Sequence, residues 1–506
     1  MAVCFAVAAP FATLAFTQTN STNSGTIAGI WRGTATAGGH SAEVSFDIRS
    51  LSEGLALYMT LPKLHAWRMP IDFLKASPDG TWSVPDWHIV LRRSGDKLAG
   101  ELGDPRVRFE LSRADALHEE PRLPAYPPGP PPVWTYDAGA PLWASAVASE
   151  GVAYIGDTRG TVHAVNVSRG TRAWTADVGA PIYGAPLAAG RSLFVFDDAG
   201  VLHRLDRRTG KTVWRVDLGA DSSPRVLPAA SVFTFDFHSP QPALHDGTLY
   251  VASSRGVVHA ISVDTGRIGW QREVKSKVRA TVAVSDTRVF VATLDNDLIA
   301  LDRRTGDERW RFKATGPLTS APSIAGDLVL SASRGSWITA LTTETGAQMW
   351  AHYDWFSWIE SSGVLADGTY YVGSSDLRAV RAFDPRTGVV RWETDVLGWA
   401  WGTPAITHDT IYIGVAGPQK YVTKHEAGLV ALDRKTGMVR WRRPVPSDPV
   451  AFVSGYPGSV ALSDDMLIAP NVNGRLEGYR VRDKITGANY GIEIGPAVRT
   501  RAESLH

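Results

Sequence analysis

The sequence predicts an all-β protein: an eight-bladed β-propeller with N-to-C strand closure, preceded by a small antiparallel β-barrel or sandwich domain. Two observations predict this fold. One phrase occurs seven times with a period close to that of a four-stranded blade. The segment before the first repeat also copies the strand that the last repeat lacks. A hydrophobic share of 44% over 506 residues is sufficient for a large core.

The repeated phrase reads, in its fullest copies, Asp-x-x-Thr-Gly-x-x-x-Trp. Its aspartate is expected to accept hydrogen bonds from the backbone just downstream, and its glycine to adopt the positive φ that a tight hairpin needs. The tryptophan offers a large apolar plate with one N–H group, which suits packing between neighbouring blades. Successive tryptophans are 40, 56, 40, 40, 42 and 49 residues apart, at Trp174, Trp214, Trp270, Trp310, Trp350, Trp392 and Trp441.

The ring is expected to close through its first strand. After Trp441 an eighth unit, residues 460–479, has three predicted strands and no final tryptophan strand. Residues 133–139 copy residues 173–179 and 213–219. We therefore expect the strand around Trp134 to pair with the chain near Tyr479, which removes the free sheet edges of the last blade.

The predicted organisation has five parts. Residues 1–24 form a signal or disordered leader, 25–115 the small all-β domain, 116–132 a Pro-rich linker, 133–481 the propeller and 482–506 a C-terminal tail. In the small domain, alternating apolar residues predict strands at residues 30–33, 44–48, 55–58, 88–91, 98–102 and 107–111.

Composition limits the location and the partners. Residues 1–16 are apolar and too short to span a bilayer, and they resemble the core of a secretory signal that lacks a basic start. A periplasmic or secreted protein without a transmembrane segment is expected, the assigned start site being too late to include the basic residues; the alternative is that this stretch is only a disordered tail. Cys4 is the single cysteine, so no internal disulfide is expected. The net charge of +1 argues against a nucleic-acid partner.

The repeated phrase resembles that of the PQQ-like (quinoprotein alcohol dehydrogenase-like) β-propeller repeat superfamily. That resemblance implies two branches of function. One branch comprises dehydrogenases that use pyrroloquinoline quinone (PQQ) and calcium in the central channel. The other comprises noncatalytic propellers such as the barrel-assembly-machinery lipoprotein, the type to which this chain is most similar. The fold does not choose between the branches.

Alignment of the inner strands places one residue of each blade at the channel mouth. Among them Arg279, Glu360 and Trp401 are candidates for cofactor binding, as the cation, the calcium ligand and the aromatic floor of a quinone site. A packing role is the alternative, because eight such positions in any propeller often include a charge pair and aromatic rings. The predicted mouth residues are Trp143, Tyr183, Ser239, Arg279, Thr319, Glu360, Trp401 and Pro457.

No catalytic residue and no metal ligand is assigned. The dehydrogenases that the chain resembles place an adjacent cysteine pair against the quinone, and this chain has no cysteine after Cys4. His163, His203 and His259 occupy one slot in three successive blades, which puts them about 10 Å apart, too far to share a metal ion with bonds of about 2 Å. No cofactor is therefore expected, and PQQ with calcium is the alternative.

Aromatic residues crowd the segments that border the channel. A shared collar of such rings suits a protein partner or a small ligand. The alternative is that the rings cover the inner-strand core. The predicted collar residues are Trp143, Tyr183, Phe235, Trp355, Trp358 and Trp399. The leading hypothesis is an exported, noncatalytic binding propeller, and the alternative is a divergent PQQ-dependent dehydrogenase.

Overall fold

The computed structural model describes residues 27–122, 125–220, 225–228, 235–418, 421, 423–446, 448 and 451–481. These residues contain 42 strands and two 3₁₀ turns, η1 (Pro62–Leu64) and η2 (Pro85–Trp87), which confirms the all-β class. Among them, no helix has the length and apolar character needed to cross a membrane. The predicted leader and tail, residues 1–24 and 482–506, lie outside the described residues. The described chain forms two compact units, one with β1–β9 and the other with β10–β42.

The first unit is a single antiparallel sheet of nine strands that curls into a nearly closed barrel, in the order β4-β3-β2-β1-β9-β8-β7-β6-β5. Trp31 lies at its centre, fully buried, and its indole Nε1 donates to the Ile27 carbonyl at 2.9 Å. The Arg113 guanidinium carbon lies 4.2 Å from the centre of the Trp31 ring. The strands are β1 (Gly29–Ala37), β2 (His40–Leu51), β3 (Gly54–Leu61), β4 (Ala66–Phe73), β5 (Lys75–Ala76), β6 (Thr81–Val84), β7 (Ile89–Ser94), β8 (Lys97–Leu102) and β9 (Asp104–Ala114).

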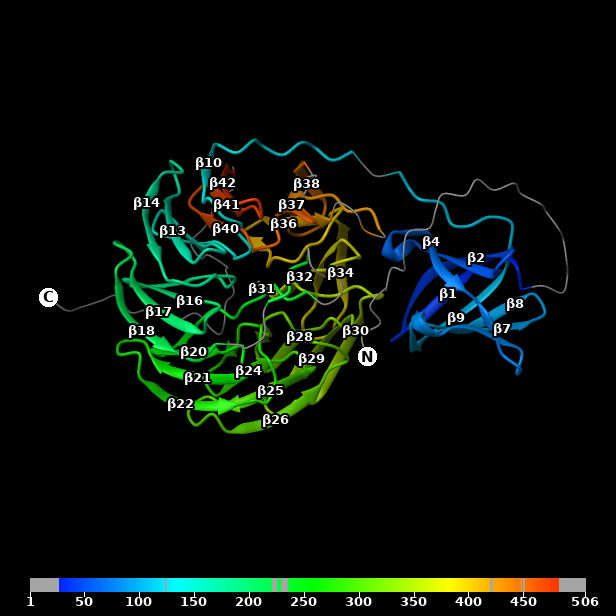
Figure 1. The fold of residues 1–506 in the computed structure, drawn as a ribbon, viewed down its shortest axis with the longest axis horizontal. Helices are drawn as coiled ribbons and strands as arrows, with labels where there is room; N and C mark the ends of the chain where they lie inside the picture. Colours follow the sequence, from blue (N-terminus) through cyan, green and yellow to red (C-terminus); the bar gives the residue numbers. More distant parts are fainter. Residues whose placement is uncertain are drawn as a thin grey trace. The chain divides into compact units, whose positions relative to one another are not determined.

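The second unit consists of eight antiparallel sheets arranged around one axis, which confirms the eight-bladed propeller (Figure 1). Blades 1 to 4 follow one another along the chain. Blade 1 contains β11 (Val147–Ser149), β12 (Val152–Gly156), β13 (Thr161–Asn166) and β14 (Arg172–Asp177). Blade 2 contains β15 (Leu187–Ala189), β16 (Ser192–Phe196), β17 (Val201–Asp206) and β18 (Thr212–Asp217). Blade 3 contains β19 (Ala243–His245), β20 (Thr248–Ala252), β21 (Val257–Ser262) and β22 (Ile268–Glu273). Blade 4 contains β23 (Ala283–Val284), β24 (Arg288–Ala292), β25 (Asp297–Asp302) and β26 (Glu308–Lys313).

Blades 5 to 8 continue in the same sense. Blade 5 contains β27 (Ser323–Ala325), β28 (Leu328–Ala332), β29 (Trp337–Thr342) and β30 (Gln348–Tyr353). Blade 6 contains β31 (Val364–Ala366), β32 (Thr369–Gly373), β33 (Ala379–Phe383) and β34 (Val390–Asp395). Blade 7 contains β35 (Ala405–Ile406), β36 (Thr410–Pro418), β37 (Gly428–Asp433) and β38 (Val439–Pro444), and β39 (Val453–Gly455) pairs with β36. Blade 8 contains β40 (Ala461–Ser463), β41 (Met466–Pro470), β42 (Arg475–Arg480) and β10 (Trp134–Asp137).

Blade 8 closes the ring as the sequence predicts. Strand β10 pairs antiparallel with β42, with Trp134 opposite Gly478 and Asp137 opposite Arg475. The glycine is needed there, since a Cβ atom at Gly478 would lie 2.1 Å from the Trp134 ring. The first strand of the propeller therefore completes its last sheet, and the ring is joined by main-chain hydrogen bonds.

The repeated phrase forms a hairpin turn that seats the tryptophan of the preceding blade. In blade 4, Asp302 Oδ1 accepts from the backbone N–H of Arg304 at 2.9 Å, and Gly306 has a φ of +75°. Trp270 of blade 3 lies under that glycine and donates from Nε1 to the Arg303 carbonyl at 3.0 Å. The same indole-to-carbonyl bond, at 2.7 to 3.1 Å, joins Trp134 to Val167, Trp174 to Arg207, Trp310 to Thr343, Trp350 to Pro385 and Trp392 to Arg434.

The end of the Pro-rich segment lies along the outer edge of blade 7. Pro128 forms a parallel bridge with Arg442 of β38. Gly129 donates its N–H to the Arg442 carbonyl at 2.9 Å, and Arg442 donates to the Pro127 carbonyl at 2.8 Å. This part of the segment is therefore bound to the propeller and covers one exposed strand edge.

Candidate functional site

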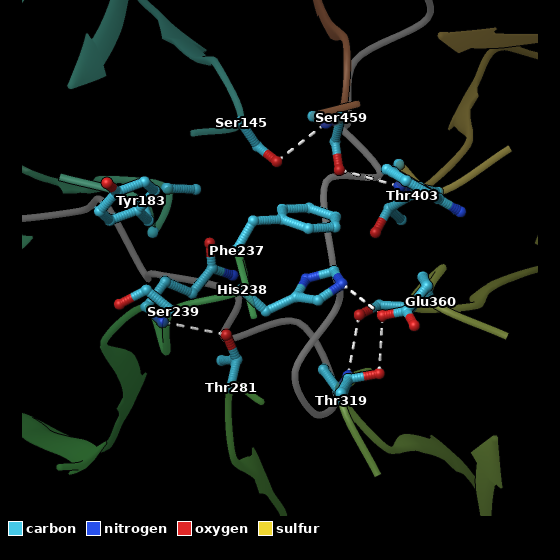
Figure 2. Close-up of a pocket in the computed structure, with 18 of the residues that line it drawn as sticks. Ser145, Tyr183, Phe237, His238, Ser239, Thr281, Thr319, Glu360, Thr403 and Ser459 are labelled. Carbon is cyan, nitrogen blue, oxygen red and sulfur yellow. Dashed lines mark hydrogen bonds and ion pairs between the residues drawn. The ribbon is translucent and has the colours of Figure 1, made fainter. Parts of the chain in front are cut away.

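All eight residues predicted at the channel mouth line one cavity of about 70 Å³ in the propeller (Figure 2). The regular repeat explains their common position, because each lies four residues before the first residue of an innermost strand. Trp143 precedes β11, Tyr183 β15, Ser239 β19, Arg279 β23, Thr319 β27, Glu360 β31, Trp401 β35 and Pro457 β40.

Two residues after the mouth residue, five of the eight blades carry a Ser or Thr. Four of these hydroxyl oxygens accept a backbone N–H of the neighbouring blade, which fixes blades 7, 8 and 1, blades 3 and 4, and blades 5 and 6 to one another beside the mouth. The bonds run from Ser459 N–H to Ser145 Oγ at 2.8 Å, Thr403 to Ser459 Oγ at 2.8 Å, Gln241 to Thr281 Oγ1 at 3.0 Å and Ala321 to Ser362 Oγ at 2.8 Å. The sequence reasoning missed these hydroxyl contacts. Their signal was a Ser or Thr two residues after the mouth residue in five of the blades: Ser145, Thr281, Ser362, Thr403 and Ser459.

The channel continues into a more apolar cavity of about 370 Å³. The two cavities share Ser145, Ala185, Gln241, Thr403 and Ser459. Aliphatic side chains of blades 1, 2, 3, 7 and 8 form much of its wall, including Val147, Leu187, Leu244, Ile406 and Val460. The charged and aromatic groups of the channel are therefore concentrated at the mouth.

A segment of the chain itself enters the mouth. Residues Phe235–His238, here called the mouth segment, come from the long connection between β18 and β19. Phe237 stacks on Trp401, with 5.2 Å between ring centres and 28° between ring planes, and it lies 5.3 Å from Trp143. Figure 2 shows Phe237 and His238 among the residues of the cavity wall. Trp401, the predicted aromatic floor of a quinone site, is therefore already stacked against an aromatic side chain of the same protein.

The two charged mouth residues also bind the mouth segment. Arg279 Nε donates to Asp236 Oδ2 at 2.6 Å, and Glu360 Oε2 lies 2.7 Å from His238 Nε2. Glu360 Oε1 accepts from Arg334 Nε at 2.5 Å. Burial alone would raise the pKa of Glu360, but Arg334 and His238 outweigh it and lower that pKa to about 2. Glu360 is therefore a buried, ionised carboxylate, and each of its two oxygens has a partner.

Two further arginines bind the main chain of the segment. Arg334 Nη1 donates to the Phe235 carbonyl at 2.8 Å, and its guanidinium carbon lies 4.6 Å from the ring centres of both Phe235 and Trp358. Arg225 Nη1 donates to the carbonyls of Asp236 at 3.1 Å and His238 at 2.6 Å. The sequence reasoning named neither arginine, and no spacing in the repeats marks them.

The predicted collar residues mostly lie in the interior. Trp143, Phe235, Trp355 and Trp399 are buried, whereas Tyr183 and Trp358 are half-buried. Phe235 lies 5.6 Å from Trp358 and 5.3 Å from Trp401, and Trp399 stacks on Trp401 at 4.4 Å. Trp355 packs instead against Tyr353 at 5.5 Å. The structure thus joins Trp143, Phe235, Trp358 and Trp399 through Trp401 and Phe237, and it leaves Tyr183 and Trp358 accessible.

The mouth does not fit a quinone with calcium as it stands. Calcium takes six to eight oxygen ligands, but the Glu360 carboxylate faces the Arg334 guanidinium and the His238 ring. Within the described residues, no group of three His, Cys, Asp or Glu side chains converges as metal ligands would. The Arg279 guanidinium, the candidate partner for a quinone carboxylate, already pairs with Asp236.

The three histidines of the common slot lie within their own blades. His163 Nε2 lies 3.0 Å from Asp157 Oδ2, and His203 Nε2 lies 2.9 Å from Asp197 Oδ2. Asp157 and Asp197 also accept backbone N–H groups of the turn that precedes each histidine. In blade 3 a serine holds the position of the acid, and burial lowers the pKa of His259. The two His–Asp pairs brace the turns between the two middle strands.

Comparison with known proteins places the chain in a family. The sequence profile of the family described as outer membrane protein assembly factor BamB matches residues 129–233, 198–353 and 334–488, more than half of the chain. The quinohemoprotein alcohol dehydrogenase of Comamonas testosteroni is 30% identical over 253 residues, which are 43% of this chain and 34% of that enzyme. BamB of Shewanella oneidensis is 22% identical over 243 residues, 44% of this chain and 61% of that protein. The matches span less than two thirds of either relative.

Solved structures agree on the fold. The crystal structure of the Comamonas testosteroni quinohemoprotein alcohol dehydrogenase superposes with a TM-score of 0.53 and 14% identity, over 71% of this chain and 78% of that chain. This likeness concerns the fold alone. With the closed ring of eight blades and the profile match over most of that ring, the chain belongs to the family described as outer membrane protein assembly factor BamB, within the PQQ-like β-propeller superfamily.

Proposed function

We propose that the protein is an exported, noncatalytic propeller that binds a protein partner or a small ligand at its channel mouth, in the periplasm or outside the cell. One observation carries this proposal: the mouth is committed to its own chain. Arg279 pairs with Asp236, and Glu360 pairs with His238 and Arg334. A quinone enzyme needs groups of this kind for its cofactor, whereas a binding protein needs only a shaped and charged surface.

The relatives support a protein partner and a place at the cell envelope. Those named BamB are described as outer membrane protein assembly factors, and an assembly factor acts on other proteins. The apolar stretch at residues 1–16 favours export. The balanced charge of the chain, +1 overall, favours neither nucleic acid nor an anionic membrane surface.

The accessible anchors are Tyr183 and Trp358. Both are half-buried: Tyr183 lines the mouth cavity under the Arg225 guanidinium, and Trp358 packs against Phe235 of the mouth segment under the guanidinium of Arg334. Partly buried aromatic residues beside arginines are the composition in which binding energy concentrates at protein interfaces. We therefore assign the partner contact to these two side chains.

Site-specific crosslinking tests this assignment. A photoreactive phenylalanine analogue replaces Tyr183, Trp358 or, as the control, Val389, which is 61% exposed just before the outer strand of blade 6. In an extract of the source cells' envelope, we expect a shared protein product from positions 183 and 358 and none from position 389. Native mass spectrometry of the purified protein tests for a small ligand. The same products from all three positions, or no product and no retained ligand, would contradict the proposal.

The second candidate is a divergent PQQ-dependent dehydrogenase. The 30% identity to a quinohemoprotein alcohol dehydrogenase favours it. This function would require the mouth segment to leave the channel. Glu360 would also have to give up its ion pairs with Arg334 and His238 in order to bind calcium. Uptake of PQQ with calcium separates the two candidates.

A further inference from the structure

We propose that the channel mouth is a peptide-binding site, and that the mouth segment occupies it as the chain's own copy of the ligand. The ligand class is an extended peptide with the pattern aromatic, Asp or Glu, aromatic. This inference rests on the proposed function and specifies the partner of the same site.

The main chain of the mouth segment is bound as a ligand is bound. The Asp236 N–H donates to the carbonyl of Val226, which is not in a strand, at 2.6 Å. In the described part of the chain, the segment pairs with no strand. Its carbonyls are instead held by arginine side chains: Arg334 binds that of Phe235, and Arg225 binds those of Asp236 and His238. These contacts recognise peptide carbonyls and require no particular side chain on the peptide.

Each side chain of the segment meets a complementary group from another blade. Phe235 packs against Trp358 and Trp401, and Phe237 against Trp401 and Trp143. Asp236 between them pairs with Arg279 at 2.6 Å. Three positively charged side chains thus converge on one carboxylate and its neighbouring carbonyls. That arrangement selects an acidic residue flanked by two rings.

The mouth segment does not satisfy the site completely. Arg334 is about nine-tenths buried, and its Nη2 has no hydrogen-bond partner in the described part of the chain. A buried N–H group without an acceptor is costly, so an additional carbonyl or carboxylate at this point would favour binding. The cavity that Phe237 and His238 line also keeps an open volume of about 70 Å³. A separate peptide can therefore contact more of the mouth than the tethered segment does.

Competition with the tethered segment sets the expected affinities. A segment attached to the same chain has an effective concentration in the millimolar range, on the order of that for short flexible linkers. A free peptide must displace it, so opening the mouth should raise the peptide's apparent affinity. The probe is a fluorescent peptide with the sequence of residues 233–240, Phe-Thr-Phe-Asp-Phe-His-Ser-Pro.

Fluorescence anisotropy with the full chain provides the test. The double variant Phe235→Ala, Phe237→Ala should bind the probe at least tenfold more tightly than the wild-type protein. It should bind a control peptide with Asp replaced by Lys at least tenfold more weakly than the probe. Adding Arg279→Met to the double variant should remove the preference between the two peptides. If the double variant loses the circular dichroism of the folded protein, Asp236→Asn replaces it, with an expected gain of at least threefold.

Two outcomes overturn the inference: a folded variant that binds the probe no more tightly than the wild-type protein, or one that binds both peptides equally. The proposed function fails separately. Crosslinks at Tyr183 and Trp358 without tighter peptide binding would refute only the peptide inference. An opened variant that takes up PQQ and calcium and oxidises an alcohol would refute the noncatalytic function itself.

Discussion

Glu360 is the residue on which the mouth depends. Its side chain is fully buried. Its carboxylate pairs with Arg334 and His238 and accepts a hydrogen bond from the Thr319 hydroxyl at 2.9 Å. Arg334 in turn holds the Phe235 carbonyl. A single carboxylate thus connects the mouth segment to blade 5, and its ionised form is the one that the fold stabilises.

The acid stability of the protein should report this carboxylate. The pKa of Glu360 is lowered from 4.5 to about 2 in the folded protein, so its contribution to the free energy of unfolding is present above pH 4.5 and is lost as the pH falls towards 2. Glu360→Gln should lower the free energy of unfolding at pH 7 by about 3 kcal/mol, because Arg334 then stays buried without its partner. The difference from the wild-type protein should shrink as the pH falls from 4.5 towards 2, measured as urea unfolding by tryptophan fluorescence.

The matched control is Glu344→Gln. Glu344 pairs with Arg288 at 2.7 Å, but its side chain is 75% exposed, so its removal should change stability little at either pH. An equal loss in the two variants at pH 7, or a Glu360→Gln loss that does not depend on pH, would contradict the assignment of Glu360 as a buried ionised group.

The element that repeats is the hairpin turn over a tryptophan. At Gly306 two requirements coincide: the backbone has a φ of +75°, and a Cβ atom would lie 2.6 Å from Cε3 of Trp270. Among the described residues, the tryptophan of blade 2 lacks the indole-to-carbonyl hydrogen bond formed elsewhere in the ring, because another side chain binds the carbonyl. Trp214 Nε1 has no partner in the described part of the chain, and the Val263 carbonyl, which matches the acceptors in the other blades, instead accepts from Arg204 at 3.1 Å.

Substitution of these glycines should separate the two requirements. Gly306→Ala combines the left-handed backbone with the collision against Trp270, so we expect a loss of about 2 to 4 kcal/mol in the free energy of unfolding. Gly326 has a φ of +65°, and a Cβ atom at this position would meet nothing within 4 Å, so Gly326→Ala should lose only about 1 kcal/mol. Thermal unfolding by circular dichroism measures both, and equal losses would show that the tryptophan contact adds nothing to the backbone cost.

At the scale of the whole molecule, the ring could be predicted because its information is local and repeated. Each turn phrase specifies one hairpin, and the copy of the final strand at residues 133–139 predicts the closure that Trp134 and Gly478 form. In the first unit, the six predicted strands correspond to β1, β2, β3, β7, β8 and β9. Strands β4, β5 and β6 were missed because prolines and short runs there obscure the alternation of apolar residues.

The mouth could be predicted only in part. The repeat register identified all eight mouth residues, because they occur at a fixed distance of four residues before the innermost strands. The entry of the mouth segment could not be derived, since it depends on Arg225, Arg279 and Arg334 from three places in the chain. Of the predicted collar, the structure brings Trp143, Phe235, Trp358 and Trp399 together around Trp401 and Phe237, but neither Tyr183 nor Trp355 joins this group. The burial of these rings depends on how Phe235 and Phe237 pack between them. Their role in binding stays a prediction.

The most direct test of the account is an equilibrium titration of the purified wild-type protein with PQQ and calcium, followed by the absorbance of the bound quinone. Because Asp236, Phe237 and His238 already occupy Arg279, Trp401 and Glu360, we predict no bound quinone at high micromolar cofactor and no alcohol-dependent reduction of a dye. A bound quinone spectrum together with alcohol-dependent turnover would contradict the account.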